Sequence, residues 1–429
     1  MSNLRAHQVA AVSMVQECYR RRVKRVLLVM PTGAGKTHTA AELIRRAIVK
    51  GRRVLFLVHR REIVLDTVRR VRAAGIACGV VMAGEAREDA SVQVASVQTI
   101  AARGNHPTAD LVIWDEAHHT AAETYKAIAA KYVDAYHLGL TATPERGDGQ
   151  GLSDAFDELV APVTVAELTA EGLLSPCDVV APAQRLQGAI ADNPVDAWIA
   201  HAAGRPTVAF FATVAESEGY ARDFNRFGIK AEHVDGGTSR RERDAILARF
   251  AAGEIDVLCN VFVLTEGWDC PRAKVCLIAR GCGSTGTYLQ MVGRVLRPDG
   301  AGTRALVIDL AGAVNEHGKP DEARLFTLDG IDRKKSGREW IAQCLQCGFT
   351  CPGAKRGKAC RRCGAEWPAP EAKAISETAL VTVGRVPTRD EKDRELTRLL
   401  GIARERGYRS GWAGYAFKSK YGHWPRGIK

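Results

Sequence analysis

Two series of short apolar runs divide the first 310 residues of the chain. The first series comprises residues 26–30, 54–58, 92–96, 111–114 and 137–143, and the second comprises 207–211, 231–234, 255–260, 275–279 and 305–310. Most runs are continuous in Val, Ile and Leu, which is typical of strands buried on both faces of a parallel sheet. Segments with helical periodicity separate them. The pattern predicts two α/β domains that are joined within residues 172–193.

The chain changes character after about residue 330. A charged connector leads into a cysteine-rich segment that ends near residue 365, and the stretch WPAPEAKA follows as a linker. Thr388 and Glu391 form a capping box for one helix that Gly407 ends, and Ser410 caps a second helix that runs to about Lys420. The predicted divisions are therefore 1–170, 171–330, 331–370 and 371–429.

The surplus positive charge lies entirely in the last hundred residues. The chain has a net charge of +12. Residues 331–429 contain 22 Lys and Arg against 10 Asp and Glu, whereas the first 330 residues contain 39 of each. A basic surface can serve solubility alone. A neutral body with a basic end instead favours a polyanionic partner for that end, and nucleic acid is the preferred interpretation.

Features of membrane and secreted proteins are missing from the sequence. No apolar run reaches the length of a membrane-spanning helix, and no charged-then-apolar leader precedes the first domain. Seven of the twelve cysteines are scattered singly, and the other five lie between residues 344 and 363. We therefore expect a cytoplasmic protein with reduced thiols, no membrane partner and one local metal site.

The cysteine-rich segment has the spacing of a zinc site. Cys344, Cys347, Cys360 and Cys363 follow the pattern C-x₂-C-x₁₂-C-x₂-C. Each C-x₂-C turn offers two thiolates, and two turns complete the four ligands of a tetrahedral Zn²⁺. A redox role fits poorly because no thioredoxin-like unit accompanies the pairs. Cys351 is a spare thiol that could replace one ligand.

The residues PTGAGKT at 31–37 follow an apolar run and precede an Ala-rich helical pattern. A loop of Gly33, Ala34 and Gly35 lets backbone N–H groups face a phosphate at a helix N-terminus. Lys36 supplies a cation for the outer phosphates, and the Thr37 hydroxyl can bind Mg²⁺. The strand before, the helix after and the GKT ending together predict an ATP site.

Two carboxylates end another buried run, at Asp115 and Glu116. The carboxyl ends of parallel strands form the crevice where α/β sheets bind ligands. Asp115 is expected to hold Mg²⁺ through water, and Glu116 to orient and deprotonate the water that attacks ATP.

The segment 287–298, TYLQMVGRVLRP, is predicted to form a helix that Thr287 caps and Pro298 ends. Gln290, Arg294 and Arg297 would then lie on one face. An arginine finger neutralises charge during phosphoryl transfer and accelerates it by about 10³–10⁵. These arginines belong to the second domain, so they would reach the nucleotide only when the two domains close over it. A split site of this kind is the design of a motor.

Nine segments between residues 4 and 310 resemble, in order, the motif series of superfamily 2 helicases. They are LRAHQ, PTGAGKT, LVHRRE, SVQT, DEAHH, LTATP, VAFFAT, NVFVLTEGWDCP and QMVGRVLRP. Their DEAH form is most similar to the branch that holds XPB-like, RadD-like and restriction-type translocases. The cysteine cluster after the motor resembles RadD-like members, and the size resembles phage or prophage members.

The resemblance implies two tandem RecA-like domains followed by a zinc ribbon and a basic helical tail, with ATP, Mg²⁺ and Zn²⁺ as cofactors. It implies that adenine is recognised by Arg5 and Gln8. From the second domain, the ATP site would be faced by Gly267 and Asp269. Coupling of the nucleotide to the nucleic acid would use His118, Thr141 and Thr143. Residues implied to line the nucleic-acid groove are Arg60, Ser96, Gln98, Thr99 and Thr265.

The implied activity is that of an ATP-dependent DNA helicase or translocase in a bacterial cell or a phage-infected host. Single-stranded, forked or branched DNA is the expected partner, with replication or repair proteins as further partners. DNA is favoured over RNA because the chain has neither a DEAD sequence nor a QRxGRxGR helix. A duplex translocase that does not unwind, an RNA helicase and an ATP-gated loading factor remain alternatives.

Aromatic and cationic residues alternate in the tail between residues 408 and 426. One interpretation is that the aromatics stack on bases while the cations follow the backbone. The other is that Trp412, Tyr415 and Ala416 form a helical stripe that packs on the preceding helix. The second interpretation is favoured.

Overall fold

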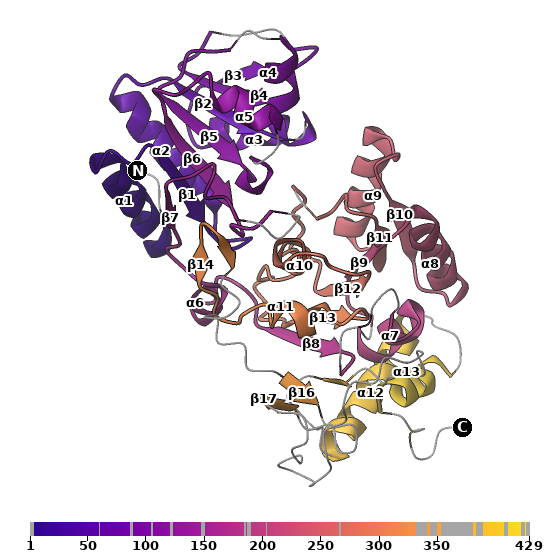
Figure 1. Cartoon of the computed structure of the whole chain (residues 1–429). Coiled ribbons are helices and arrows are strands. Elements are labelled where there is room, and N and C mark those ends of the chain that lie inside the picture. The colour runs from indigo at the N-terminus through magenta and orange to yellow at the C-terminus, as the bar shows by residue number, and fades with distance from the viewer. Residues whose placement is uncertain are drawn as a thin grey trace. The chain divides into compact units, whose positions relative to one another are not determined.

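The structure is a computed structural model (Figure 1) that describes residues 4–59, 61–85, 89–103, 106–120, 123–146, 151–183, 186, 190–202, 204–265, 267–331, 341–343, 350–352, 381–382, 389–406, 411–421 and 425. The chain forms two compact units. The first comprises Met1–Leu173 with Gly283–Leu289 and Ala323–Gly337. The second comprises Leu174–Cys282, Gln290–Glu322 and Arg338–Lys429.

The first unit contains a seven-stranded sheet in the order β3-β4-β2-β5-β6-β1-β7, with every neighbouring pair parallel. Its strands are β1 (Arg25–Val29), β2 (Val54–Val58), β3 (Gly79–Val81), β4 (Val92–Ser96), β5 (Leu111–Asp115), β6 (Tyr136–Thr141) and β7 (Glu158–Val160). The central strands are buried along nearly their whole length, as the continuous apolar runs predict.

Helices cover both faces of this sheet. They are α1 (Ala6–Arg20), α2 (Lys36–Val49), α3 (Arg61–Ala73), α4 (Val97–Arg103), the 3₁₀ turn η1 (Ala117–His119), α5 (Glu123–Ala129) and α6 (Val165–Ala170). α2 packs against α1 and α3, whereas α4 packs against α5. This division follows from right-handed crossovers, because the strand order reverses direction after β3. A short antiparallel pair, β14 (Phe326–Thr327) and β15 (Gly330–Ile331), also belongs to this unit.

The second unit repeats the strand order of the first. Its sheet runs β10-β11-β9-β12-β13-β8-β18. The strands are β8 (Cys177–Ala181), β9 (Thr207–Phe211), β10 (Ala231–Val234), β11 (Val257–Asn260), β12 (Val275–Ala279), β13 (Ala305–Asp309) and β18 (Val381–Thr382). β8–β13 pair in parallel, whereas β18 pairs antiparallel with β8. Thus a strand from late in the chain closes the second sheet.

The helices of the second unit are α7 (Pro194–His201), α8 (Val214–Arg226), α9 (Arg240–Ala252), α10 (Thr285–Val292), α11 (Ala313–His317), α12 (Arg389–Arg406) and α13 (Trp412–Tyr421). α10 begins in the segment assigned to the first unit. Side chains fix several helix starts. Asn193 accepts a hydrogen bond from the Val195 amide ahead of α7, and Thr213 with Glu216 forms a capping box for α8.

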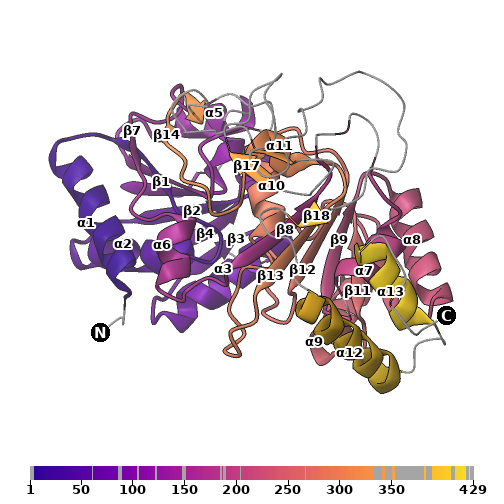
Figure 2. The ribbon, with the colours of Figure 1, turned by 90° about the horizontal axis from the view of Figure 1, so that it is seen from below.

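The tail helices complete the core of the second unit. Leu399, Trp412, Ala416 and Phe417 are buried in one cluster with Trp198 of α7. Both views show α13 beside α7 (Figures 1 and 2), and α12 packs against α13. The packing interpretation therefore holds for Trp412 and Ala416, although the cluster includes α7 as well as α12. The side chain of Tyr415, the third residue of the predicted stripe, lies outside the described part of the chain.

The remaining described elements are an antiparallel pair, β16 (Ile341–Gln343) and β17 (Thr350–Pro352). No helix within the described part of the chain combines the length and the apolar character that crossing a membrane requires. The structure adds β3, β7, β8 and β14–β18 to the predicted strands. β8 lies inside the segment that was expected to join the domains.

Candidate functional site

The predicted phosphate loop lies between β1 and α2. Gly33 and Gly35 have φ angles of 89° and 87°, which only glycine adopts at low cost. α2 begins at Lys36, directly after Gly35, so its first N–H groups lie at the end of the loop. The Lys36 ammonium donates to the carbonyl of Met30 at 3.2 Å.

The start of α2 has the properties of an anion site. Its first turn carries no acidic residue and has no side-chain cap among the described residues. Uncapped N–H groups and the helix dipole both favour negative charge at this position. The loop, Lys36 and the half-buried Thr37 therefore fit a nucleotide triphosphate with Mg²⁺.

The N-terminus of α1 contacts the predicted phosphate loop. The Gln8 amide donates to the Ala34 carbonyl at 3.2 Å, and its oxygen accepts from the Arg5 amide at 3.0 Å. His7 Nε2 also lies 3.0 Å from the Ala34 oxygen. A Cβ on Gly35 would come within 2.2 Å of the Gln8 nitrogen. Gln8 is thus engaged at both ends of its amide, and its predicted reading of adenine stays a prediction.

The two predicted carboxylates lie at the carboxyl end of β5. Asp115 is the last residue of that strand, and its oxygen accepts a hydrogen bond from the Glu116 amide at 3.2 Å. Glu116 has a left-handed backbone conformation, with φ of 50°. Such strain in a residue other than glycine is common at functional sites. Glu116 Oε2 is buried and accepts no hydrogen bond from any described residue.

The three predicted coupling residues lie together with Glu116. His118 Nδ1 is 3.5 Å from Glu116 Oε2 and 3.4 Å from the Thr141 hydroxyl. The Thr141 hydroxyl in turn donates to the Thr143 carbonyl at 2.7 Å and accepts from the Thr143 amide at 3.2 Å. The chain of contacts connects β5 with the end of β6.

Sequence reasoning missed a set of stacked rings beside this corner. His118 and His119 have ring centroids 4.2 Å apart, and His119 stacks on His59 at 4.3 Å. His59 Nδ1 lies 2.9 Å from the Tyr125 hydroxyl. His59 directly follows β2, and its position in LVHRRE was the available signal. The rings connect the loop after β2 with η1.

The predicted groove residues of the first unit lie at the end of β4 and the start of α4. The Ser96 hydroxyl donates to the Gln98 side chain at 2.8 Å, and Thr99 is buried in α4. Arg60 lies outside the described residues. In the second unit, Thr265 is 5% exposed and its amide donates to the Phe262 carbonyl at 3.1 Å. The roles of these residues on nucleic acid stay predictions.

The predicted helix over 287–298 is wrong in its bounds. α10 spans Thr285–Val292, so only Gln290 of the three polar residues is helical. Gly293 follows the helix, and glycine is a poor helix former. The chain continues in a turn in which the Arg294 amide donates to Met291 at 3.2 Å. Gln290, Arg294 and Arg297 therefore do not share one helical face.

Both arginines bind groups of their own unit. Arg294 is 7% exposed and donates from Nε to the Thr265 carbonyl at 3.0 Å and from Nη1 to the Trp268 carbonyl. Arg297 forms an ion pair with Asp269. Gly267 has a φ of 72° in the same loop. These contacts connect the segment after α10 with Thr265, Trp268 and Asp269.

The zinc prediction falls on Cys344, Cys347, Cys360 and Cys363, which lie outside the described residues. Of Cys351, only the backbone in β17 is described. Within the described parts of the chain, no group of three or more His, Cys, Asp or Glu residues could hold a metal ion.

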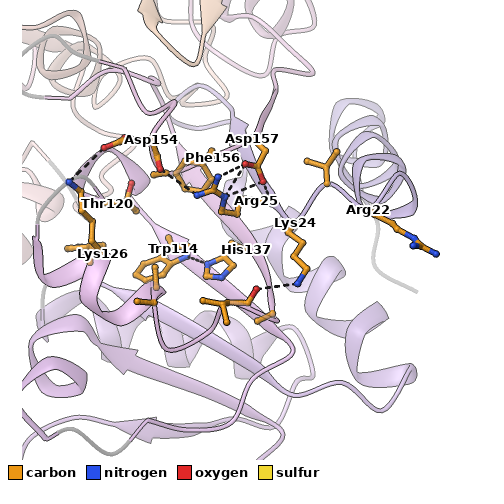
Figure 3. Close-up of a pocket in the computed structure, with 17 residues that line it drawn as sticks. Arg22, Lys24, Arg25, Trp114, Thr120, Lys126, His137, Asp154, Phe156 and Asp157 are labelled. Carbon is orange, nitrogen blue, oxygen red and sulfur yellow. Dashed lines mark hydrogen bonds and ion pairs between the residues drawn. The ribbon is translucent and has the colours of Figure 1, made fainter.

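A cavity of about 900 Å³ lies in the first unit near the amino-terminal ends of β1 and β6 (Figure 3). Its polar groups pair with one another. Trp114 Nε1 donates to His137 Nδ1 at 3.0 Å, and Arg25 forms an ion pair with Asp157. Burial lowers the pKa of His137 below its usual value, so it stays neutral near pH 7. The predicted phosphate and carboxylate groups do not line this cavity, and we do not assign the site to it.

Two family models match the chain. Residues 1–146 match "Type III restriction enzyme, res subunit", and residues 192–299 match "Helicase conserved C-terminal domain". The phosphate loop and the carboxylates lie in the first match. Gln290, Arg294 and Arg297 lie in the second.

Similar proteins share both halves of the chain. A "51.5 kDa protein" of Lactococcus phage (isolate 7-9) is 31% identical over 78% of this chain and 76% of its own length. A "DNA 3'-5' helicase XPB" of Kineococcus radiotolerans is 27% identical over 64% of this chain and 54% of its own length. The chain thus spans about half of that helicase.

The fold also has a solved counterpart. A fragment of a putative HsdR subunit of a type I restriction enzyme from Vibrio vulnificus YJ016 matches with a TM-score of 0.59 and 22% identity, over 74% of this chain and 66% of that one. This similarity agrees with two tandem parallel-sheet α/β domains of the RecA-like kind.

Proposed function

The chain belongs to the superfamily 2 helicases, and from this premise we propose that it is an ATP-dependent DNA helicase or translocase. ATP hydrolysis between the two RecA-like domains would drive movement along DNA or its unwinding. The observation that carries the proposal is the uncapped start of α2 after the 31–37 loop, with Glu116 at the end of β5 in the same unit. The name of the Kineococcus relative supports DNA as the partner.

In the proposed reaction, the loop N–H groups and Lys36 hold the phosphates, and the Thr37 hydroxyl and Asp115 hold Mg²⁺. When bound, Mg²⁺ would neutralise charge on the outer phosphates. Glu116 orients the attacking water and accepts its proton, since its buried Oε2 has no hydrogen-bond donor among the described residues. His118 and Thr141 then pass the change in the nucleotide to the loop after β6.

Arg294 and Arg297 are proposed to stabilise the transferring phosphoryl group when the domains close. Because each arginine already has a partner in its own unit, closure must replace those contacts with contacts to phosphate. Hydrolysis would therefore depend on the state of the second unit. This dependence is what couples ATP turnover to movement.

The test is an ATPase assay with single-stranded, duplex and forked DNA and with RNA. Lys36→Ala and Glu116→Gln should reduce turnover by at least about 100-fold while DNA binding survives. His38→Ala, an exposed neighbour in α2, serves as the matched control. Turnover that persists in both active-site variants, or stimulation by RNA alone, would refute the proposal. A strand-displacement assay separates unwinding from translocation.

We also propose that the chain belongs to the XPB/RadD-like branch and carries a zinc ribbon at Cys344, Cys347, Cys360 and Cys363. The spacing of the cysteines supports this. Metal analysis of the purified protein should find zinc that Cys360→Ser and Cys363→Ser lose. A protein that is free of zinc when purified without chelator would contradict it.

A further inference from the structure

Phe262 combines three unusual properties in the second unit. It is a large aromatic residue that is 45% exposed. Its φ is 58°, in the left-handed region that a bulky side chain rarely adopts. The Arg280 guanidinium lies over its ring, 3.6 Å from the centroid. A strained, exposed aromatic residue is retained where the surrounding structure fixes it, and such residues cluster at functional sites.

The contacts around Phe262 fix the ring in place. Its carbonyl accepts a hydrogen bond from the Thr265 amide at 3.1 Å. The side chain of the fully buried Asn260 accepts from the Leu264 amide at 3.3 Å and donates to the Ala209 carbonyl of β9 at 3.0 Å. The loop after β11 is therefore anchored to the neighbouring strand, and Phe262 is held outward by its backbone.

The Phe262 ring is also a favourable neighbour for the Arg280 guanidinium. Arg280 directly follows β12, and burial lowers its pKa below the usual value. Nη1 is buried and makes no hydrogen bond to any described residue. The face of an aromatic ring is a favourable neighbour for such a cation. One face of Phe262 is thus occupied by Arg280, and the exposed part of the ring is left for a ligand.

The position of the pair agrees with a nucleic-acid ligand. β11 and β12 flank β9 in a parallel stretch of the sheet, so Phe262 and Arg280 lie at its carboxyl edge. Thr265, expected to touch the nucleic-acid backbone, is three residues away in the same turn. Proteins that bind single strands combine an aromatic ring for the base with cations for the phosphates.

We infer that Phe262, backed by Arg280, is a stacking platform for one base of a single-stranded nucleic acid. The inference rests on the proposed function and deepens it, because backbone contacts alone do not distinguish a strand with accessible bases from a duplex. Stacking on Phe262 requires an unpaired base. The second unit would therefore prefer single-stranded segments.

The experiment compares two fluorescent probes of equal length at one salt concentration: an oligothymidylate and a strand that has the same backbone but no bases. Phe262→Ala should weaken binding of the oligothymidylate roughly tenfold and leave binding of the base-free strand unchanged. Phe262→Trp should keep the preference. Phe227→Ala is the matched control, since Phe227 is also 45% exposed but ends α8 with a φ of −84°.

Phe262→Gly gives a second route to the same answer, because glycine suits the left-handed backbone and preserves the fold if alanine does not. It should lose the preference for bases as alanine does. Equal weakening on both probes, or no weakening in either variant, would overturn the inference. If the wild-type protein bound neither probe and no DNA stimulated its ATPase, the proposed function would fail and take this inference with it. If the wild-type protein bound the oligothymidylate and neither variant weakened that binding, only the stacking platform would be refuted and the proposed function would stand.

Discussion

The two units repeat one strand order, yet they present their functional residues in different ways. In the first unit, the start of α2 is uncapped and Glu116 Oε2 is buried without a hydrogen-bond donor among the described residues. In the second unit, Arg294 and Arg297 are bound to backbone carbonyls and to Asp269. The start of α2 can thus accept an anion as it stands, whereas Arg294 and Arg297 already have partners. We call the first unit, with the start of α2 and Glu116, the receptive half, and the second unit, with Arg294 and Arg297, the responsive half.

The units also differ in how their sheets are completed. β7 closes the first sheet in parallel from a nearby part of the chain. β18 closes the second sheet in the antiparallel direction, and α12 and α13 fill its core from late in the chain. A strand close in sequence thus closes the first sheet, and a strand from late in the chain closes the second. The stability of the second unit therefore depends on its tail.

The largest expected effect comes from removing an arginine of the responsive half. Arg297→Ala should reduce DNA-stimulated turnover by about 10³ while changing the melting temperature little, because a half-exposed ion pair contributes about 1 kcal/mol or less. Arg294→Ala should lose both turnover and stability, since its buried guanidinium holds two carbonyls. ATPase assays and thermal melting measure both.

Arg304→Ala is the control for the arginine variants. It removes another exposed ion pair of the second unit, the one with Asp178, so turnover should be retained. If Arg297→Ala hydrolysed ATP at the wild-type rate, the proposed exchange of partners would be wrong.

A second test addresses the core of the second unit, which α12 and α13 complete. Leu399→Ala should lower the free energy of unfolding by about 2–5 kcal/mol because the side chain is fully buried in the cluster with α7. Leu400→Ala is the neighbouring control at 42% exposure and should change it by less than about 0.5 kcal/mol. Urea unfolding measures both variants. Equal effects would show that α12 does not pack as described.

A third test examines the receptive half at Gln8. If the amide reads adenine, Gln8→Ala should reduce the preference for ATP over GTP by about tenfold in kcat/KM. If it only anchors the Ala34 carbonyl, turnover of both nucleotides should fall equally. Parallel steady-state assays decide between the two, with His7→Ala as the variant that removes the other contact to Ala34.

The smallest expected effect concerns the loop that follows Arg297. A hydrogen bond from the Thr303 hydroxyl, with help from the Ala301 amide and Lys274, lowers the pKa of Asp299 to about 2. The folded state therefore gains stability from the ionised carboxyl above the unfolded pKa of 3.8, and loses it as the pH falls toward 2.

Asp299→Asn should lower stability at pH 7 by about 1 kcal/mol once solvent screening is allowed for, and the difference from wild type should shrink only below about pH 4. Urea unfolding over a pH series measures this. A difference that stays constant below pH 4 would show that the ionised carboxyl is not its source.

The sequence predicted most of the buried framework. Ten apolar runs correspond to ten strands, because a strand covered on both faces needs continuous apolar residues whatever surrounds it. β3 and β7 were missed because three residues carry too little pattern. β8 was missed because it lies where the sequence suggested a linker.

The functional site was predictable where chemistry is local and unpredictable where contacts are distant. The loop 31–37 and the pair Asp115 and Glu116 are contiguous in sequence, and the structure brings them to strand ends as expected. The engagement of Gln8 with Ala34 joins residues that lie apart in the chain. Helical periodicity alone could not show that Arg294 prefers the carbonyls of Thr265 and Trp268.

The completion of the second core by α13 has a consequence for synthesis. A ribosome releases Met1–Leu173 long before it reaches Trp412, so the nucleotide-binding half can begin to fold while its counterpart still lacks part of its interior. Until those late residues emerge, the part of the Trp198 cluster that they cover stays open to chaperones and proteases. A message truncated before codon 412 would therefore yield a phosphate-binding unit attached to a partner that cannot mature.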